Sequence, residues 1–394
     1  MNRCSTIEFS DSTSVLGGIL SAANRLRAVI AGPGSIAYYH ADALRRAGVE
    51  IAAIVGSRRS TEQAKAFDVP IASTDLVELI EQVPFEVLHI CTPNALHVPM
   101  ARAAILAGKH VVCEKPLALS SRDSAELVAL AGQAGIIHAV CFNNRLYPLV
   151  QEMMERVRSG TIGRVFAIRA SIVDDSLLEA DDGGWRLDST VGGEAVVVST
   201  LGSHLLDLVS HVAGEPIVEV CADFMTCHPR RRHGDEGYDF SGEEVANILV
   251  RFASGARGVL AMSQVVSGRP YRVAIEIDAA RNAMAWDSES PNTLWVGARG
   301  EATQLLLRDQ RLLSDHAAGF TVNHGAYREG FADTFFQLVR HVYADIARHK
   351  QGTLRKGPTF YPTFLDGHRA VMLQEAIVAS ARSNSWVSVA KDPK

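Results

Sequence analysis

Short apolar runs alternate with amphipathic helical segments through the first third of the chain. Apolar residues dominate 27–31, 50–55, 85–91 and 110–113, and each run is followed by apolar positions at helical spacing. Strands that alternate with helices in this way are typical of βαβ units, which build a parallel sheet. The pattern therefore predicts a doubly wound domain, which we place at residues 26–145.

Further along the chain the spacing of apolar residues changes to alternation. Over residues 217–307, segments with apolar residues at every second position are separated by turn signals, which indicates antiparallel strands. Two amphipathic helices are predicted at 329–350 and 365–382, followed by a last strand at 386–389. We therefore expect an α/β fold class with a second, α+β domain at 146–394, built on an open, mainly antiparallel sheet. The last helix and strand are expected to pack back on the first domain.

Size and charge narrow the range of partners. The chain has 394 residues, more than one hydrophobic core usually organises, so two domains are expected. Hydrophobic residues make up 47% of the chain and charged residues 21%, which is ordinary for a globular protein. The net charge of −5 gives no electrostatic reason to bind nucleic acid. No apolar run is long enough for a membrane span, so we expect neither nucleic acid nor a membrane as a partner.

The N-terminal residues and the cysteines bear on where the protein works. Residues 1–25 contain an interrupted apolar piece that is too short for a secretory signal, so we predict a loose N-terminal extension. The six cysteines show neither a CxxC motif nor zinc spacing. Several lie in apolar strands, as reduced cysteines do in cytosolic proteins. A cytoplasmic location is expected.

The loop from the first strand into the first helix is rich in glycine. Residues 32–37 read Gly-Pro-Gly-Ser-Ile-Ala, a GxGxxA pattern. The first glycine allows a tight turn, and the second lets the backbone approach a pyrophosphate at the helix N-terminus. The small third residue permits close packing of helix on strand. A dinucleotide cofactor is therefore predicted, bound by Gly32, Gly34, Ser35, Ile36 and Ala37.

The end of the second strand bears on the choice between NAD and NADP. An acidic residue there would bind the ribose 2′-hydroxyl of NAD, whereas this chain has a glycine followed by Ser57, Arg58 and Arg59. Hydroxyl and guanidinium groups suit a 2′-phosphate, so we expect NAD(P), with NADP slightly favoured over NAD. The alternative is that the arginines form a solvated turn, which NAD enzymes also have.

Polar side chains follow two of the later strands, where ligands bind in open α/β sheets. Thr92-Pro93-Asn94 is predicted to line the path of the nicotinamide half of the cofactor, with His97 starting the next helix. Glu114-Lys115-Pro116 places two opposite charges at the mouth of the sheet. A lysine desolvated there has a lowered pKa and can exchange protons near neutral pH. This stretch alone fits an ion pair without a catalytic task equally well.

His204, in an apolar helix predicted at 195–212, is a second candidate for proton transfer. A histidine in such a helix is more often a core or capping residue, but Asp207 lies on the same face and is placed to hydrogen-bond the imidazole. Oxidation of an alcohol needs a group that takes the hydroxyl proton, which lysine or histidine can do. His204, Asp207 and His211 also share a helix face, as metal ligands would. Without an HExxH motif or a cysteine cluster, we expect no metal.

Three stretches resemble the Gfo/Idh/MocA family of oxidoreductases, which includes glucose-fructose oxidoreductase and inositol dehydrogenase. They are GPGSIAYYHADAL (32–44), CTPNALHVPMARAAILAGKHVVCEKPLAL (91–119) and GSHLLDL (202–208). The glycine loop is generic, whereas the EKP element after that helix and strand is specific. The resemblance spans most of 27–390. It implies a Rossmann domain, a second domain with an open antiparallel sheet, and hydride transfer to or from a sugar or polyol.

The resemblance also assigns residues to the site. It implies that Lys115 and His204 flank the reacting carbon and that Trp185 and Arg186 lie near the cofactor or substrate. Many relatives carry an aspartate where this chain has Thr200, which can hydrogen-bond a substrate hydroxyl but cannot act as a carboxylate base. The residues expected to bind cofactor, beyond the glycine loop, are Ser57, Arg58, Arg59, Thr92, Pro93, Asn94, His97, Glu114, Lys115 and Arg186.

Later segments resemble the branch of the family that contains levoglucosan dehydrogenase and the glycoside 3-dehydrogenases. They are 263–269, 286–297 and 327–331, although those relatives often have histidine at the position of Tyr327. Aromatic rings can stack on a sugar face, and amide, guanidinium and carboxylate groups can bond its hydroxyls; a structural role is the alternative for each. The residues expected to bind substrate are Lys115, Asn144, Arg145, Tyr147, Trp185, Asp188, Thr200, His204 and Tyr327.

Together these features predict an NAD(P)-dependent dehydrogenase or reductase that acts on a secondary alcohol or ketone of a sugar, glycoside or cyclitol. One alternative is an enzyme with tightly bound NAD(H) that epimerises or cleaves glycosides through a transient keto-sugar. Another is a non-catalytic dinucleotide-binding sensor, which would have no use for Lys115 and His204. The open sheet has an exposed face of the kind that partner subunits cover, so a homodimer or homotetramer is expected.

Overall fold

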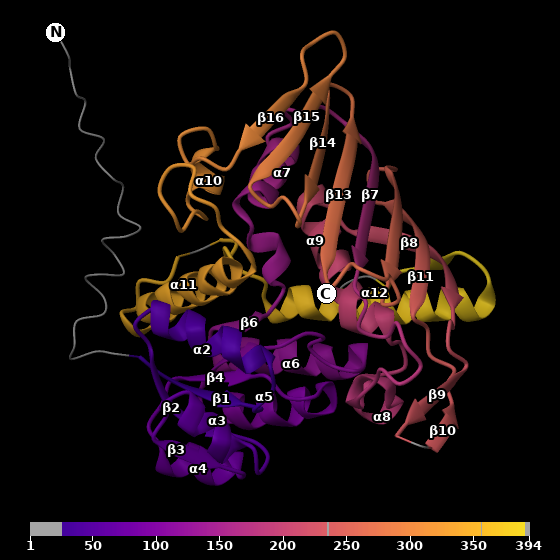
Figure 1. The fold of residues 1–394 in the computed structure, drawn as a ribbon. Helices are drawn as coiled ribbons and strands as arrows, with labels where there is room; N and C mark the ends of the chain where they lie inside the picture. The colour runs from indigo at the N-terminus through magenta and orange to yellow at the C-terminus, as the bar shows by residue number, and fades with distance from the viewer. Residues whose placement is uncertain (1–25, 235, 356, 391–394) are drawn as a thin grey trace, which may run out of the picture.

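The computed structural model describes residues 26–234, 236–355 and 357–390. The lower part of Figure 1 is a six-stranded parallel sheet with the strand order β3-β2-β1-β4-β5-β6. Its strands are β1 (Arg27–Ala31), β2 (Glu50–Val55), β3 (Ile71–Ser73), β4 (Val87–Ile90), β5 (His110–Cys113) and β6 (His138–Val140). The doubly wound sheet predicted from the alternating apolar runs is confirmed.

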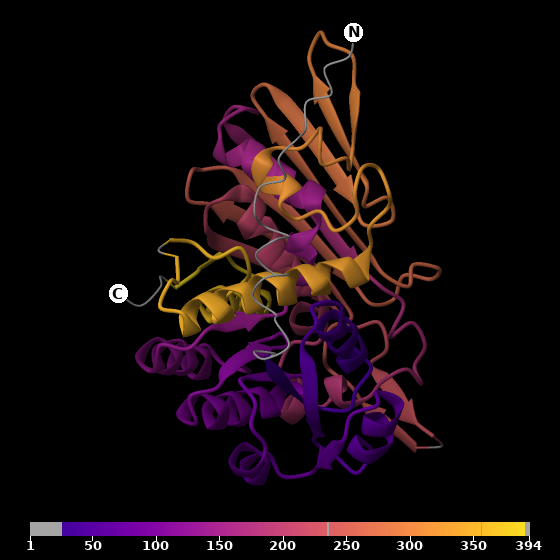
Figure 2. The same ribbon diagram turned by 90° about the vertical axis from the view of Figure 1, so that its left-hand side faces the viewer.

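Helices cover both faces of this sheet. Ile30, Ile54 and Leu88 are fully buried between the layers, which explains why the strands read as continuous apolar runs. One layer holds α4 (Leu76–Gln82), α5 (His97–Leu106) and α6 (Ser121–Ala134), and the other holds α2 (Ile36–Arg46) and α3 (Ser60–Ala66). α11 (Phe331–Lys350), from the far end of the chain, packs beside α2 in this second layer; Figure 2 shows the yellow helices against the indigo domain.

The second sheet has nine strands in the order β16-β15-β14-β13-β7-β12-β11-β8-β17. Neighbouring strands are antiparallel except β7 and β12, which run parallel. Their bounds are β7 (Val165–Val173), β8 (Ile217–Met225), β11 (Val245–Phe252), β12 (Arg257–Ser263), β13 (Arg272–Ala279), β14 (Asn282–Asp287), β15 (Thr293–Ala298), β16 (Gln304–Leu307) and β17 (Val387–Ser388). The predicted fold class is confirmed. The sequence did not predict the parallel pair, which arises because β7 comes from far upstream and enters the middle of the sheet.

Helices cover one face of the second sheet. The inward-facing Ile168, Ile248 and Leu260 share a core with α7 (Pro148–Arg158), α9 (Ser203–Ala213) and α12 (Phe364–Ser383). On the opposite face, the cross-strand neighbours Leu249 and Val259 are each 47% exposed. The shorter elements are a hairpin of β9 (Arg230–His233) and β10 (Glu236–Asp239), and α8 (Ser189–Gly192), α10 (Asp315–Ala318), η2 (Asn94–Leu96), η3 (Asn143–Leu146) and η4 (Trp185–Leu187).

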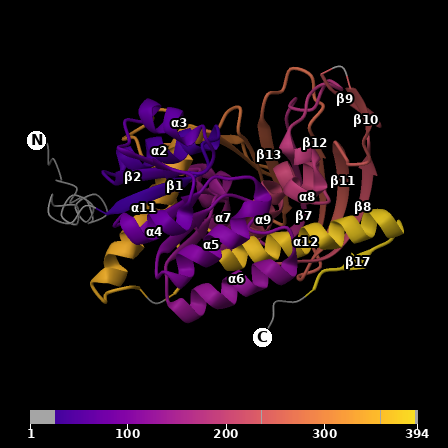
Figure 3. The ribbon, with the colours of Figure 1, turned by 90° about the horizontal axis from the view of Figure 1, so that it is seen from below.

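Two segments depart from the sequence-based expectations. The helix predicted at 195–212 begins as a π-helical turn, η5 (Val198–Gly202), and continues as α9. At the C-terminus, α12 packs beside α6 of the first domain, as expected (Figure 3). β17, however, pairs with β8 and remains with the second sheet.

The described residues bear on two further expectations. The N-terminal extension predicted at residues 1–25 lies outside them. Among the helices that the structure describes, none combines the length and the apolar character that crossing a membrane requires.

Candidate functional site

The glycine loop joins β1 to α2 at the carboxyl edge of the parallel sheet. Gly32 has a φ of +101°, and a Cβ there would lie 2.5 Å from the carbonyl oxygen of Cys91. Only glycine fits this close approach of two backbone segments. Ser35 makes no side-chain cap where α2 begins at Ile36, and Ala37 is fully buried. The N-terminus of α2 is therefore open to an anion such as a dinucleotide pyrophosphate.

The turn after β2 lies against the glycine loop. A Cβ on Gly56 would be 2.9 Å from Pro33 Cδ, which shows how closely the two turns approach. Ser57, Arg58 and Arg59 are exposed, and the backbone N–H of Arg59 donates to Ser57 Oγ at 3.3 Å. The contact expected between these side chains and the cofactor stays a prediction.

The loop after β4 connects the two domains. Asn94 donates from Nδ2 to the backbone carbonyl of Gly192 at 2.8 Å, which anchors α8 over the sheet edge. Pro93 precedes η2 with extended backbone. Thr92 Oγ1 is buried and has no hydrogen-bond partner within the described ranges, so it is available to a bound group.

His97 does not offer a free donor to a cofactor. Its Nδ1 lies 2.7 Å from the carbonyl oxygen of Pro116, and its Nε2 lies 3.0 Å from that of Thr92. Burial lowers the pKa of the imidazole, and the two carbonyls oppose this shift. Because both ring nitrogens face backbone oxygens, the predicted cofactor contact is corrected. His97 instead ties the loop after β4 to the loop after β5.

Lys115 projects from the end of β5 toward the second domain. Its Nζ donates to the carbonyl oxygen of Thr200, in the π-helical turn, at 2.6 Å. Burial lowers the pKa of Lys115 to about 8; the carboxylates of Glu114 and Asp174 oppose this shift, and the charge of Arg186 adds to it. The side chain is half-buried, so it can exchange a proton with a bound molecule near neutral pH.

Glu114 belongs to a buried chain of hydrogen bonds that sequence reasoning missed. Its Oε1 lies 3.1 Å from Nε2 of His40 on α2, and Nδ1 of His40 lies 2.9 Å from Nδ1 of His89 on β4. His89 Nε2 in turn lies 2.9 Å from the hydroxyl of Tyr343 on α11. Burial favours the neutral acid, but the bond and charge of His40 outweigh it and lower the pKa of Glu114 to about 2. A fixed anion thus adjoins Lys115.

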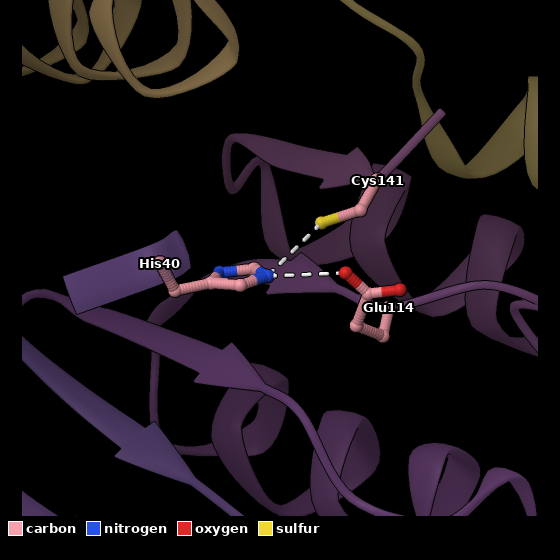
Figure 4. A group of neighbouring side chains, drawn as sticks. All are labelled: His40, Glu114 and Cys141. Atoms are coloured by element: carbon pink, nitrogen blue, oxygen red, sulfur yellow. Dashed lines mark hydrogen bonds and ion pairs between the residues drawn. The ribbon is translucent and has the colours of Figure 1, made fainter. Parts of the chain in front are cut away.

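Cys141 completes this group, which Figure 4 shows at the edge of the sheet. Its Sγ lies 3.7 Å from His40 Nε2, and the ligand atoms of His40, Glu114 and Cys141 all lie within 4.8 Å of one another. They bond each other, and burial raises the pKa of the thiol well above its usual value. The sequence signal for this group is a histidine in the first turns of α2 that faces the sheet. This signal can be recognised only once the order of the strands is known.

His204 begins α9 directly after the π-helical turn. Its Nδ1 is buried, and no described residue bonds it. Burial lowers the pKa of the imidazole to about 3, and the charge of Lys115 adds to this effect. The imidazole is therefore neutral at neutral pH. The expected bond from Asp207 is absent from the described hydrogen bonds, because Asp207 pairs with Arg145 at 3.2 Å.

Asp174, at the end of β7, supplies a carboxylate that the sequence did not reveal. It is buried, and burial raises its pKa, although hydrogen bonds from Ser176 oppose this. Its charge acts on Lys115 and on the hydroxyl of Tyr271. Asn144 donates from Nδ2 to that hydroxyl at 2.7 Å. The charge of a carboxylate thus reaches Lys115 even though position 200 carries threonine.

Comparisons with known proteins agree with this arrangement. Residues 26–142 match the family model described as "Oxidoreductase family, NAD-binding Rossmann fold", and residues 150–281 match that of the GFO/IDH/MocA C-terminal domain. The protein belongs to the Gfo/Idh/MocA oxidoreductase family. It therefore carries an NAD-binding Rossmann domain, and the glycine loop fits that cofactor.

Individual relatives of this Gfo/Idh/MocA protein have low sequence identity to it, but the matches span most of both chains. Levoglucosan dehydrogenase of Pseudarthrobacter phenanthrenivorans is 26% identical over 354 residues, which cover 84% of this chain and 86% of the relative. Myo-inositol 2-dehydrogenase of Thermotoga maritima is 28% identical over 259 residues, 64% and 72% of the two chains. The solved structure of an NAD binding oxidoreductase from Klebsiella pneumoniae superposes with a TM-score of 0.83 at 29% identity, over 94% of this chain and 100% of that one.

Two residues expected to bind substrate in this Gfo/Idh/MocA protein have structural roles. Arg145 ion-pairs with Asp207 and, at 3.4 Å, with Asp366, so its guanidinium faces a different cavity further along α9. Tyr147 is 3% exposed, and its ring lies 4.9 Å from that of Trp286 in the core of the second sheet. Burial against these partners counts against a contact of either side chain with a substrate at Lys115.

The remaining predicted contacts lie on the surface. Asp188 is exposed, and its carboxylate caps α8 by accepting from the backbone and hydroxyl of Thr190. Tyr327 is 78% exposed on the loop before α11. The substrate contacts expected of these two residues stay predictions. Trp185 and Arg186 stack on each other, with the guanidinium carbon 4.5 Å from the ring centroid, and the charge of Arg186 reaches Lys115.

Proposed function

We propose that this protein transfers hydride between a nicotinamide cofactor and a secondary alcohol or ketone of a sugar, glycoside or cyclitol. The observation that carries the proposal is the pairing of Lys115, whose pKa is about 8, with His204, whose buried Nδ1 has no partner among the described residues. Lys115 lies at the carboxyl edge of the Rossmann sheet, where open α/β folds bind ligands, and its charge acts on His204. The relatives named as levoglucosan and myo-inositol dehydrogenases support the substrate class.

Lys115 and His204 divide the work on the substrate hydroxyl. The nicotinamide, when bound, supplies the hydride acceptor or donor. Lys115 takes the hydroxyl proton, because its neutral amine is well populated near pH 8. His204, with a pKa of about 3, stays neutral and orients the hydroxyl by a hydrogen bond rather than by its charge. The Thr200 carbonyl holds Lys115 Nζ in place, and the negative Glu114 and Asp174 favour its ammonium once the proton has arrived.

A panel of sugars, glycosides and inositols tests this proposal. With NAD and with NADP in turn, at least one member should give a change in nicotinamide absorbance that matches the sugar consumed. Conversion of a sugar without net change in nicotinamide absorbance would instead favour the tightly bound cofactor and a transient keto-sugar. Cofactor binding with no conversion of any member would favour the sensor.

We further propose that the turn after β2 binds the 2′-phosphate of NADP. Arg58→Ala should weaken NADP binding by roughly ten- to a hundredfold, because a charge-assisted hydrogen bond contributes about 1.5–3 kcal/mol. NAD binding should change little, since the guanidinium has no phosphate to meet there. Fluorescence titration of the two reduced cofactors measures both effects.

A matched control for this variant is Arg122→Ala, which removes an exposed arginine from α6 on the other side of the sheet. It should alter neither affinity. Equal weakening of NAD and NADP by Arg58→Ala would mean that the turn does not read the phosphate.

We also propose that two or four chains associate through the open face of the second sheet. The exposed apolar residues Leu249, Val259, Trp295 and Leu305 lie there on neighbouring strands. An exposed face of this kind is typical of subunit contacts. Light scattering on the eluting protein should give the mass of a dimer or tetramer, and a monomeric mass would contradict this arrangement.

A further inference from the structure

A second cavity lies away from Lys115 and His204. It encloses about 910 Å³ between α9, α12, β8 and β17, within the range of small-molecule sites. Asp207, Ser210 and His211 of α9 line it, one to two helical turns beyond His204, and Arg145 lines it from η3. None of the residues of the proposed hydride-transfer site belongs to its wall.

Buried polar groups in this wall lack partners. Arg145 and Asp207 are 7% and 8% exposed and pair with each other at 3.2 Å. Over the described ranges, Arg145 Nε, Asp207 Oδ2 and Ser210 Oγ are buried without a hydrogen-bond partner. Burial raises the pKa of Asp207 to about 8, against the charge of Arg145. An unpaired buried polar group is costly, so a molecule that bonds any of these groups gains affinity from that bond.

The other charges on the wall are already occupied. Asp366 accepts from the backbone and hydroxyl of Thr363 at the start of α12. Glu219 pairs with Arg251 at 2.8 Å, and Glu215 accepts two bonds from Ser254. Asp366 also lies 3.4 Å from Arg145 and interacts with the charge of Arg369, so the cations of the wall meet an anion even when Asp207 is protonated. The cavity favours a neutral ligand.

The donors and acceptors indicate the class of ligand. A guanidinium N–H beside the carboxyl oxygen of Asp207 matches neighbouring hydroxyl groups, one accepting and one donating, and Ser210 can bond a third. Leu206, Ile217, Met372 and Leu373 give the same cavity apolar walls, which suit the C–H face of a ring. We propose that this cavity is a second binding site for a neutral polyhydroxylated ring, such as a sugar or cyclitol, separate from the hydride-transfer site.

Equilibrium dialysis with radiolabelled D-glucose and myo-inositol, in the presence of NADH, tests the second site. Ser210→Phe places a ring in the cavity and should remove one bound equivalent per chain, with turnover unchanged. Asp207→Asn keeps the volume, exchanges the carboxyl group for an amide, and should weaken that equivalent by about tenfold, or 1.4 kcal/mol. Thermal unfolding, compared with the wild type, shows whether each variant folds. If Ser210→Phe misfolds, dialysis with Asp207→Asn provides the measurement.

His204→Ala separates this proposal from the proposed function. This variant should still bind the equivalent of sugar or cyclitol that Ser210→Phe no longer binds. Binding that is lost in His204→Ala but insensitive to both cavity variants would overturn the second site, as would no binding of either probe at millimolar concentration. Failure of every sugar to exchange hydride, with cavity binding intact, would overturn the proposed function alone.

Discussion

Lys115→Ala should lower turnover by about 10²–10⁴-fold while NADH binds as it does in the wild type. Removal of a positioned proton acceptor costs this much in general acid–base catalysis. The cofactor should still bind, because the glycine loop and the N-terminus of α2 hold the pyrophosphate independently of the lysine. Steady-state rates with the best sugar of the panel and fluorescence titration of NADH measure the two quantities separately.

The pH profile identifies the group. In the wild type, alcohol oxidation should rise as the pH passes through about 8, because the deprotonated amine of Lys115 is the base; ketone reduction should fall over the same interval. Lys115→Ala should lose this dependence. Lys65→Ala, at an exposed position on α3, serves as the control and should keep both rate and profile. Loss of NADH binding with chemistry preserved would contradict the role of Lys115.

Gly32→Ala should weaken NADH binding by about a hundredfold or more and lower the thermal stability. The added Cβ would lie 2.5 Å from Cys91 O, and the φ of +101° is one that alanine adopts only with strain. The glycine loop and the loop after β4 must then separate, which displaces the N-terminus of α2 from the pyrophosphate. NADH titration and a thermal unfolding curve report the two effects.

Gly108→Ala separates crowding from strain. Gly108 follows α5 with a φ of +67°, and its added Cβ would meet no heavy atom within 4 Å. This variant should lose stability without loss of NADH affinity. If it weakened NADH as much as Gly32→Ala does, the close approach at Cys91 would not be the cause.

Local features of the sequence were enough to predict the fold of the first domain and its glycine loop. Strands buried on both faces read as unbroken apolar runs, and the strand-loop-helix order around Gly32 gives a GxGxx(G/A) pattern its meaning. The position of Lys115 at the edge of the sheet was predicted for a similar reason. A charge directly after a buried strand lies at the end of that strand, and desolvation there lowers the pKa of a lysine.

Other features depended on contacts between residues far apart in the chain. His97 was expected to bind the cofactor. In the structure both of its ring nitrogens lie against backbone carbonyls that only the folded loops bring to it. Arg145 precedes a helix near the site, yet its guanidinium pairs with Asp207, the residue that helical spacing had offered to His204. A helical period places side chains on a common face but does not say which neighbour that face will meet.

By itself, then, the sequence determined the fold class and the dinucleotide loop, because these follow from residues close together in the chain. The residues around Lys115 and His204 allowed a proton-transfer role, and the family resemblance favoured it. The tertiary structure decided what surrounds Lys115. Glu114 is held anionic by His40, which is tied through His89 to Tyr343 on α11, and Asp174 enters from β7. Electrostatic effects on a buried lysine depend on distance in space, and these distances are set by packing across some three hundred residues of chain.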